Sequence, residues 1–294
     1  MKLYYLKIAD LFVKLVVEAK NLFEVLPANY SPFIVGSDGA DNSLLKFFIT
    51  DTSVSFNQKE SVARFDDLGF AQEVYRGDDG GYVFRVFDTT NWLVATMKSD
   101  SRFENNIVHF ALHDEKSLRF GLDNMMMIAF AFSSAYHGCL MMHSSVVQKD
   151  QWGYLFLGKS GTGKSTHTSL WLKNIEGATL LNDDNPAVRV VGDSVFVYGT
   201  PWSGKTPCYK QQKAKAGAFV MLQQKPYNKI SKMNVVFGLS SLMTSCSIMT
   251  WDKKSYNRLI DSMSSILALV PVYSLECLPN ADAATLSYNT IIRT

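Results

Sequence analysis

The feature that most constrains the fold is a glycine-rich segment, GKSGTGKS, between an apolar run and a helix-competent run. It matches the pattern G-x-x-x-x-G-K-[ST], its upstream flank, residues 154–158, is typical of a buried strand, and residues 164–173 favour a helix. Between a strand and a helix, such glycines let successive backbone amides face one anion, and the helix adds the positive end of its dipole. We therefore expect a polyphosphate to bind this loop, through Gly158, Lys159, Ser160, Gly161, Thr162, Gly163, Lys164, Ser165 and Thr166.

The same motif assigns two side chains. We expect Lys164 to reach the outer phosphates and the Ser165 hydroxyl to ligate Mg²⁺. The alternative interpretation is a chance match in a glycine-containing turn. The strand before the loop and the helix after it favour the phosphate-binding interpretation.

Two adjacent carboxylates, Asp183 and Asp184, follow an apolar stretch that we predict as a strand over residues 178–182. Neighbouring carboxylates repel each other, and a divalent cation beside them removes that cost. One of them is then expected to hold magnesium, while the other takes the proton from an attacking hydroxyl. The alternative is a solvated turn that leads into Pro186.

Two further residues are candidates for the chemistry. His143 lies in a predicted strand, residues 139–147, that precedes the loop strand. It is either a hydrogen-bonded core residue or a group close to the phosphates. Lys205 ends the segment GTPWSGK, which is either a lid that places this lysine over the transferred phosphate or a hairpin exit anchored by Trp202.

The remainder of the chain is organised around these motifs. Residues 1–120 are predicted to be β-rich, with strands over residues 47–56, 81–88 and 91–98, and could bind an acceptor or a partner. Residues 121–294 are expected to form the nucleotide-binding part, which begins with a buried helix over residues 122–136. A hairpin is predicted across Gly192 and Asp193, and Asp252 is a candidate cap for a late amphipathic helix.

Composition excludes several classes. The 294 residues are 47% hydrophobic and 19% charged with a net charge of +2, without the basic clusters typical of nucleic-acid or membrane-surface partners. The four cysteines form no CxxC pair, which indicates reduced thiols. Charges interrupt the apolar N-terminal stretch, and the apolar run at residues 125–132 is far shorter than the ~20 residues of a spanning helix. We expect a soluble, cytoplasmic protein.

The order of the motifs carries a resemblance. A strand with a histidine, the loop GKSGTGKS and a Leu-Leu-x-Asp-Asp strand resemble the catalytic domain of the bacterial HPr kinase/phosphorylase family. The loop with an Asp-Asp pair is also similar to the related ATP-dependent phosphoenolpyruvate carboxykinases. The resemblance covers about residues 140–198 and extends up to residue 222. It implies an α+β or α/β fold with a compact carboxykinase-like P-loop core, in which the sheet is mixed and largely antiparallel.

The resemblance also implies roles. ATP would occupy the loop, Asp183 would be the base that deprotonates a hydroxyl acceptor, and Asp184 the magnesium-linked carboxylate, with exchange of these two roles left open. His143 would lie near the transferred group. Members of the family form oligomers, so a homo-oligomer is compatible with it. The function predicted is Mg-ATP-dependent phosphoryl transfer to a hydroxyl on a protein, peptide or metabolite. The alternatives are a nucleotide-binding sensor without turnover, a conventional ATPase and a carboxykinase-like enzyme.

Overall fold

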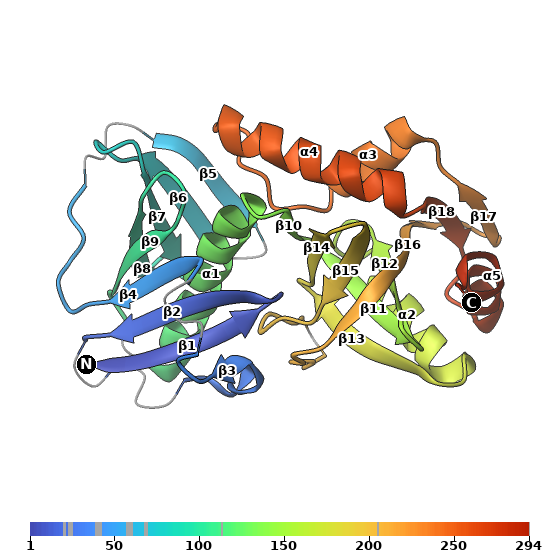
Figure 1. Cartoon of the computed structure of the whole chain (residues 1–294), viewed down its shortest axis with the longest axis horizontal. Helices are drawn as coiled ribbons and strands as arrows, with labels where there is room; N and C mark the ends of the chain where they lie inside the picture. The colour runs from blue at the N-terminus through green and yellow to red at the C-terminus, as the bar shows by residue number, and fades with distance from the viewer. Residues whose placement is uncertain are drawn as a thin grey trace. The chain divides into compact units, whose positions relative to one another are not determined.

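The structure is a computed structural model that describes residues 1–19, 22, 26–38, 43–56, 61–67, 70–112, 114–204 and 206–293. The chain divides into two compact units, Met1–Tyr136 and His137–Thr294 (Figure 1). Each unit contains a large mixed sheet and few helices, which agrees with the mixed α and β content expected from the sequence.

The first unit is built on a nine-stranded sheet with the order β3-β1-β2-β4-β9-β8-β7-β6-β5. The pairs β2–β4 and β4–β9 are parallel, whereas the other pairs of this sheet are antiparallel. The β-rich first third that the sequence predicts is therefore confirmed. The strands are β1 (Lys2–Ile8), β2 (Leu11–Val17), β3 (Ile34–Val35), β4 (Leu45–Ile49), β5 (Ser61–Asp67), β6 (Phe70–Arg76), β7 (Tyr82–Phe87), β8 (Leu93–Ser99) and β9 (Asn105–Phe110), with the 3₁₀ helix η1 at Ala28–Phe33.

Helix α1 (Glu115–Ala135) belongs wholly to the first unit, because it packs against β4, β7, β8 and β9. Its N-cap is Asp114, whose side chain accepts a hydrogen bond from the Ser117 amide, so the helix begins before the predicted residue 122. The division of the chain consequently follows Tyr136. It does not follow residue 120, which lies inside the helix.

The second unit contains the glycine-rich segment within another nine-stranded sheet. Its main path is β10-β14-β15-β16-β12-β11-β13, and β18 pairs with both β16 and β17. Two pairs, β12–β16 and β16–β18, are parallel and the others are antiparallel. These strands are β10 (Cys139–Met141), β11 (Ser144–Lys149), β12 (Trp152–Leu157), β13 (Ala178–Asp184), β14 (Ala187–Val191), β15 (Ser194–Tyr198), β16 (Lys213–Gln224), β17 (Lys229–Lys232) and β18 (Val272–Cys277).

Helices cover both faces of this second sheet. Alternate residues of β12 enter two cores: Leu155 and Leu157 belong to one with residues of α3 (Val235–Met243) and α4 (Lys253–Leu269). Tyr154 and Phe156 belong to the other, with residues of α2 (Lys164–Asn174) and α5 (Ala281–Ile291). Helix α2 is thus fixed at its buried face, which holds the end of the glycine-rich loop in a defined position.

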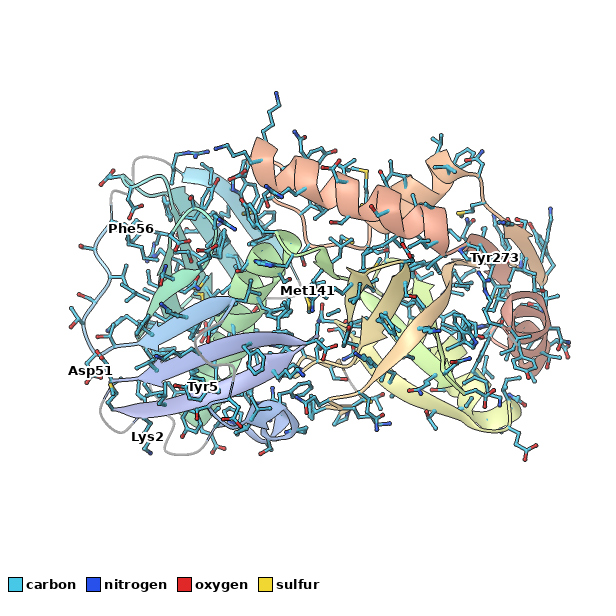
Figure 2. All side chains as sticks on the ribbon, viewed as in Figure 1. Lys2, Tyr5, Asp51, Phe56, Met141 and Tyr273 are labelled. Carbon is cyan, nitrogen blue, oxygen red and sulfur yellow. The ribbon has the colours of Figure 1, made fainter. Side chains whose placement is uncertain are left out.

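Burial follows the usual division between polar and apolar side chains. Lys2 and Asp51 are exposed, whereas Met141 on β10 is buried (Figure 2). Within the described part of the chain, no helix has both the length and the hydropathy that crossing a bilayer requires.

Candidate functional site

The glycine-rich loop joins the end of β12 to the start of α2. Gly163 is the N-cap residue of α2 and has φ 101°, and Gly158 has φ 149°. Both values lie in the positive-φ region that residues with a Cβ rarely adopt, so the turn depends on glycine at these positions. The predicted strand and helix on either side of the loop are confirmed, at Trp152–Leu157 and Lys164–Asn174.

The backbone of this loop presents unpaired donors. The Thr162 amide donates to the Lys159 carbonyl at 3.1 Å, and the Thr162 hydroxyl donates to the same oxygen at 2.7 Å. By contrast, the amides of Gly161, Gly163 and Ser165 have no acceptor among the described residues. Unpaired amides at the start of a helix are the donors that an anion can bind. The side chains of Lys159, Ser160 and Thr166 are exposed around them.

Lys164 is held inside the loop and is only 9% exposed. Its Nζ donates to the carbonyls of Gly158 at 2.8 Å and Lys159 at 3.3 Å, and it contacts His143 Nε2 at 2.8 Å. Burial lowers the pKa of the Lys164 ammonium, and the negative charges of Asp184 and Asp183 oppose that change. The cation therefore lies directly beside the loop and is held by its carbonyl oxygens.

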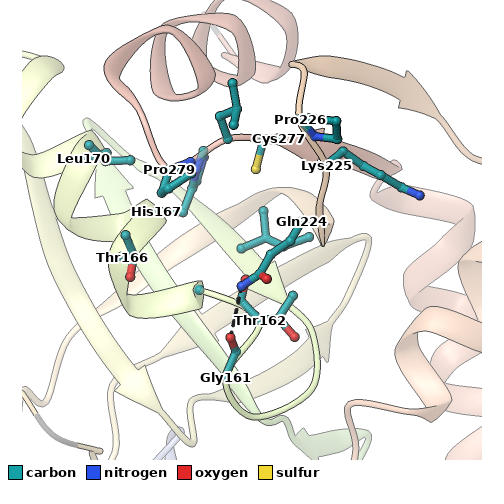
Figure 3. A pocket seen from close by; sticks show the side chains of 13 residues that line it. Gly161, Thr162, Thr166, His167, Leu170, Gln224, Lys225, Pro226, Cys277 and Pro279 are labelled. Carbon is teal, nitrogen blue, oxygen red and sulfur yellow. Dashed lines mark hydrogen bonds between the residues drawn. The ribbon is translucent and has the colours of Figure 1, made fainter.

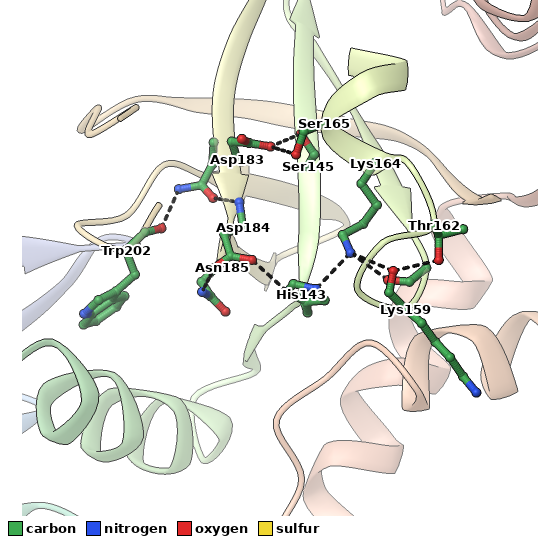
Figure 4. A network of polar contacts seen from close by, with 12 residues as sticks. His143, Ser145, Lys159, Thr162, Lys164, Ser165, Asp183, Asp184, Asn185 and Trp202 are labelled. Atoms are coloured by element: carbon green, nitrogen blue, oxygen red, sulfur yellow. Dashed lines mark hydrogen bonds and ion pairs between the residues drawn. The ribbon is translucent and has the colours of Figure 1, made fainter. Parts of the chain in front are cut away.

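His143 links Lys164 to the acid pair (Figure 4). It lies between β10 and β11, at the break between these strands, and not inside one continuous strand as predicted. Its backbone amide donates to the Ser245 carbonyl, and its Nδ1 lies 2.8 Å from Asp184 Oδ1. A lysine ammonium only donates hydrogen bonds, so Nε2 is the acceptor and Nδ1 carries the proton that is donated to Asp184.

The two carboxylates of β13 contact different neighbours, because successive side chains of a strand point to opposite faces of the sheet. Asp183 is 4% exposed, and its Oδ1 accepts hydrogen bonds from Ser145 Oγ at 2.8 Å and Ser165 Oγ at 2.9 Å. The Asp184 side chain is 32% exposed and contacts His143 and Asn185. The predicted closeness of the pair to the loop is thus present in the structure, with one carboxylate directed to Ser165 and the other to His143.

The oxygen atoms around Asp183 are suited to a magnesium ion. Asp183 Oδ2 is buried and has no hydrogen-bond partner among the described residues, and the Ser165 hydroxyl lies on the same carboxylate. Mg²⁺ prefers hard oxygen ligands and usually takes one or two from the protein, with the remainder from phosphates and water. The described residues contain no group of three or more His, Cys, Asp and Glu side chains that could hold a metal alone. The donor set therefore fits magnesium bound together with a phosphate group, not a cage formed by protein alone.

The segment after β15 approaches the acid pair closely. The Gly204 amide donates to the Asp183 carbonyl at 2.7 Å, and Ser203 forms an isolated bridge with Asp184. A Cβ built on Gly204 would lie 2.6 Å from the Asp183 oxygen, so this approach requires glycine. Trp202 is buried, as expected for the alternative in which this segment is a hairpin exit anchored by Trp202. Lys205 lies outside the described residues, and the predicted lid role of this lysine is therefore not described by the structure.

One member of the polar network, Ser145, was missed by sequence reasoning. Ser145 donates to Asp183 and also contacts Thr168 Oγ1 at 3.1 Å. Ser145 is the register partner of Asp183 across β11 and β13, and a pairing register cannot be read from residues so far apart in sequence. Gly204 was expected only to bend the segment GTPWSGK, and its contact with Asp183 depends on a strand that is distant in sequence.

No protein-family model matches the sequence, and no curated protein matches it. Among solved structures, the HPr(Ser) kinase/phosphatase from Coxiella burnetii matches 51% of this chain and 91% of its own chain, with 11% sequence identity and a TM-score of 0.29. A likeness at this level does not establish membership of a family.

Proposed function

We propose that this chain is a phosphotransferase that uses Mg-ATP to phosphorylate a hydroxyl group. The observation that carries the proposal is the polar network of the second unit. It joins the unpaired amides of the glycine-rich loop to both carboxylates, through Ser165 to Asp183 and through Lys164 and His143 to Asp184. Phosphoryl transfer needs positioned donors, a metal-binding carboxylate and a base, and catalysis then depends on charge neutralisation and alignment.

The loop is assigned to the triphosphate. The amides of Gly161, Gly163 and Ser165 would donate to phosphate oxygens, at the positive end of the α2 dipole. Lys164 would exchange its contacts with the carbonyls of Gly158 and Lys159 for contacts with the outer phosphates. An ammonium–phosphate hydrogen bond joins opposite charges, whereas the carbonyl bonds do not, so the exchange is favourable.

Magnesium is assigned to Ser165 and Asp183. The two side chains already lie 2.9 Å apart, and the unpartnered Asp183 Oδ2 offers a further ligand atom. The ion would supply neutralisation of the charge on the outer phosphates. The family resemblance gave the magnesium to Asp184 and left an exchange with Asp183 open. The present assignment makes that exchange, with Asp183 as the metal-linked carboxylate.

Asp184 is assigned as the base. It is the more exposed of the two carboxylates, and His143 Nδ1 donates to it and fixes its orientation. The acceptor's hydroxyl proton would pass to the Asp184 carboxylate. The acceptor's oxygen would form a bond to the γ-phosphorus while the bond from that phosphorus to the β–γ bridging oxygen breaks, and ADP leaves. His143 acts on the acceptor only through Asp184 and is therefore a positioning residue.

The function is tested by measuring ADP formation from Mg-ATP, with and without free serine, threonine and short serine-containing peptides. The proposal predicts ADP production that depends on an acceptor, together with a phosphorylated product of matching amount. It also predicts that Asp184→Asn removes this activity and keeps ATP binding, while Asp193→Asn, in the exposed turn between β14 and β15, changes neither. Equal ADP formation without any acceptor would indicate an ATPase, and ATP binding without turnover on any acceptor would indicate a sensor.

A further inference from the structure

The first unit has a sheet face opposite α1 that takes no part in the proposed function. That function uses the second unit, where a cavity of about 680 Å³ adjoins the glycine-rich loop (Figure 3). In the first unit, Phe132 of α1 lies against Phe84 of β7, with 6.1 Å between the ring centroids. Phe84 is linked by register through Met97 to Val108, which therefore shares the face that α1 covers. Ile107 precedes Val108 in β9 and lies on the opposite face, because successive side chains of a strand alternate.

Two rows of side chains cross this opposite face over β1, β2, β4 and β9, which are neighbours in the sheet (Figure 1). The pairing register places Tyr5, Lys14, Lys46 and Asn105 in a basic row, and Leu3, Val16, Phe48 and Ile107 in an apolar row beside it. The side chains between them along the strands, such as Leu15, Phe47 and Val108, are fully buried on the α1 face. By contrast, Leu3 and Ile107 are 43% and 46% exposed, and Lys46 is exposed as well.

The basic row contains two lysines without a carboxylate partner. Lys14 and Lys46 are register partners across the parallel pair β2–β4, and neither forms an ion pair with a carboxylate of the described residues. On the same face, Lys98 lies 3.0 Å from Asp79, so its charge is paired. Two adjacent like charges repel each other, and an anionic group that contacts both removes this cost. The basic row is therefore suited to a negatively charged partner.

Protection of a sheet edge does not explain these lysines. Lysines on an edge strand prevent its pairing with other chains. The edges of this sheet are β3 and β5, whereas β2 and β4 lie inside it. The lysines also lie beside an apolar row, and contiguous exposed apolar surface marks interaction sites.

We propose that this face binds an acidic peptide segment of a partner protein. Its carboxylates would contact Lys14 and Lys46, and its apolar side chains would cover Phe48 and Ile107. The two rows are two residues apart along each strand, about 6.5 Å, which is within the reach of neighbouring side chains of one peptide. The proposal goes beyond the proposed function and does not rest on it, because no nucleotide takes part.

The composition of the two rows favours a peptide over other anionic partners. Single-stranded nucleic acids stack their bases on exposed aromatic side chains, whereas the exposed residues of the apolar row, Leu3 and Ile107, are aliphatic. Anionic membranes attract clusters of about four to eight basic residues, and the basic row contains only a pair of lysines.

Binding is tested on the full chain without nucleotide. The probe is a fluorescein-labelled copolymer of glutamate and tyrosine, and its binding is followed by fluorescence anisotropy. The native chain should bind this probe about threefold or more tightly than polyglutamate, which has the charge without the apolar side chains. Affinity should fall as salt is added, and a copolymer of lysine and tyrosine should not bind.

A pair of double variants with equal net charge tests the place of binding. Lys14→Glu with Lys46→Glu reverses the basic row and still has two like charges in register. Its control is Lys253→Glu with Lys254→Glu, which reverses two exposed lysines at the start of α4 in the second unit. The first double variant should weaken binding of the glutamate–tyrosine copolymer by about tenfold or more, because like charges then meet at the surface. The control should leave the affinity unchanged.

Lysine acetylation of the native chain gives a second measurement, which decides the question even if a variant does not fold. The glutamate–tyrosine copolymer, at about ten times its Kd, should slow modification of Lys14 and Lys46 by about tenfold and leave Lys253 unchanged. Equal slowing at Lys253, or equal loss of affinity in both double variants, would overturn the proposal. So would no binding of the acidic copolymer, equal binding of polyglutamate, or tighter binding of a thymidine oligonucleotide or of phosphatidylserine vesicles. None of these outcomes changes the proposed function, which is measured by ADP formation.

Discussion

The exchanged roles of the two aspartates give the sharpest prediction. Replacing Asp183 by Asn keeps an oxygen that can accept from Ser145 and Ser165, but it puts an amide nitrogen where Oδ2 now has no described partner. A buried donor without an acceptor costs about 1–3 kcal/mol. The variant also loses the charge assigned to magnesium. We therefore expect Asp183→Asn to lower the free energy of unfolding by about 1–3 kcal/mol and to abolish the increase in ATP affinity caused by Mg²⁺.

Asp184→Asn is the matched comparison. This side chain is 32% exposed, and an amide oxygen can still accept the hydrogen bond from His143 Nδ1. The expected loss of stability is at most about 1 kcal/mol, because a partly exposed hydrogen bond contributes little. ATP affinity should keep its dependence on Mg²⁺, while turnover with an acceptor should fall by roughly 10²–10⁴-fold, the usual contribution of a general base.

The assay combines three measurements on each variant: urea unfolding, ATP affinity by calorimetry with and without Mg²⁺, and single-turnover transfer. The reasoning is refuted by the reverse pattern, in which Asp184→Asn loses the magnesium effect and Asp183→Asn retains it with only turnover reduced. Such a result would restore the assignment that the family resemblance implies.

Three other predictions follow from the structure. Lys164→Ala removes an ammonium assigned to the outer phosphates and should weaken ATP binding by about tenfold to a hundredfold, measured by calorimetry; unchanged affinity would contradict the loop assignment. Gly163→Ala and Gly192→Ala both place a Cβ at a positive φ, 101° and 57°, so each should lower the free energy of unfolding by roughly 1–2 kcal/mol, measured by thermal unfolding. Only Gly163→Ala should also weaken ATP binding. An equal effect of both variants on binding would contradict the loop assignment. Burial raises the pKa of the Asp123 carboxyl group, although the hydrogen bonds from Tyr30 and Asn29 act to lower it. The contribution of this group to stability is therefore fully present below the unfolded pKa and is lost as the pH rises through the folded pKa. The thermal unfolding midpoint of Asp123→Asn, measured relative to that of the native chain, should therefore rise between about pH 4 and about pH 7. A difference in midpoint that stays constant with pH would show that the carboxyl group does not titrate as described.

Local chemistry allowed much of the second unit to be predicted. The hairpin across Gly192 and Asp193 forms between β14 and β15, with Gly192 at φ 57°, and Asp252 caps α4 by accepting from the Ser255 amide. Glycine at a tight turn and a carboxylate at an N-cap act within a few residues, so sequence spacing reveals them. The strand–loop–helix order around the glycine-rich segment was predictable for the same reason.

The partners inside the site were not predictable, because they depend on contacts between distant segments. β13 continues through Asp184 instead of ending at residue 182, since its pairing with β11 extends to the partners Ser144 and Asp184. Because both aspartates belong to the strand, their carboxylates lie on opposite faces of the sheet, and Asp183 accepts a hydrogen bond from Ser165. Similarly, the predicted strand over residues 47–56 ends at Ile49, where its parallel partner β9 pairs with it through Val108. A β-branched composition does not fix the length of a strand, because its partners do.

The central claim is that the glycine-rich loop binds the phosphates of a nucleotide while Asp183 faces them across a metal ion. A crystal structure of the chain with magnesium and a non-hydrolysable ATP analogue tests it most directly. The account predicts phosphate oxygens on the amides of Gly161, Gly163 and Ser165, a metal ion bound by Ser165 and Asp183, and Asp184 beside the γ-phosphate. Nucleotide bound elsewhere, or a loop whose amides make no contact with phosphate at saturating ligand, would contradict it.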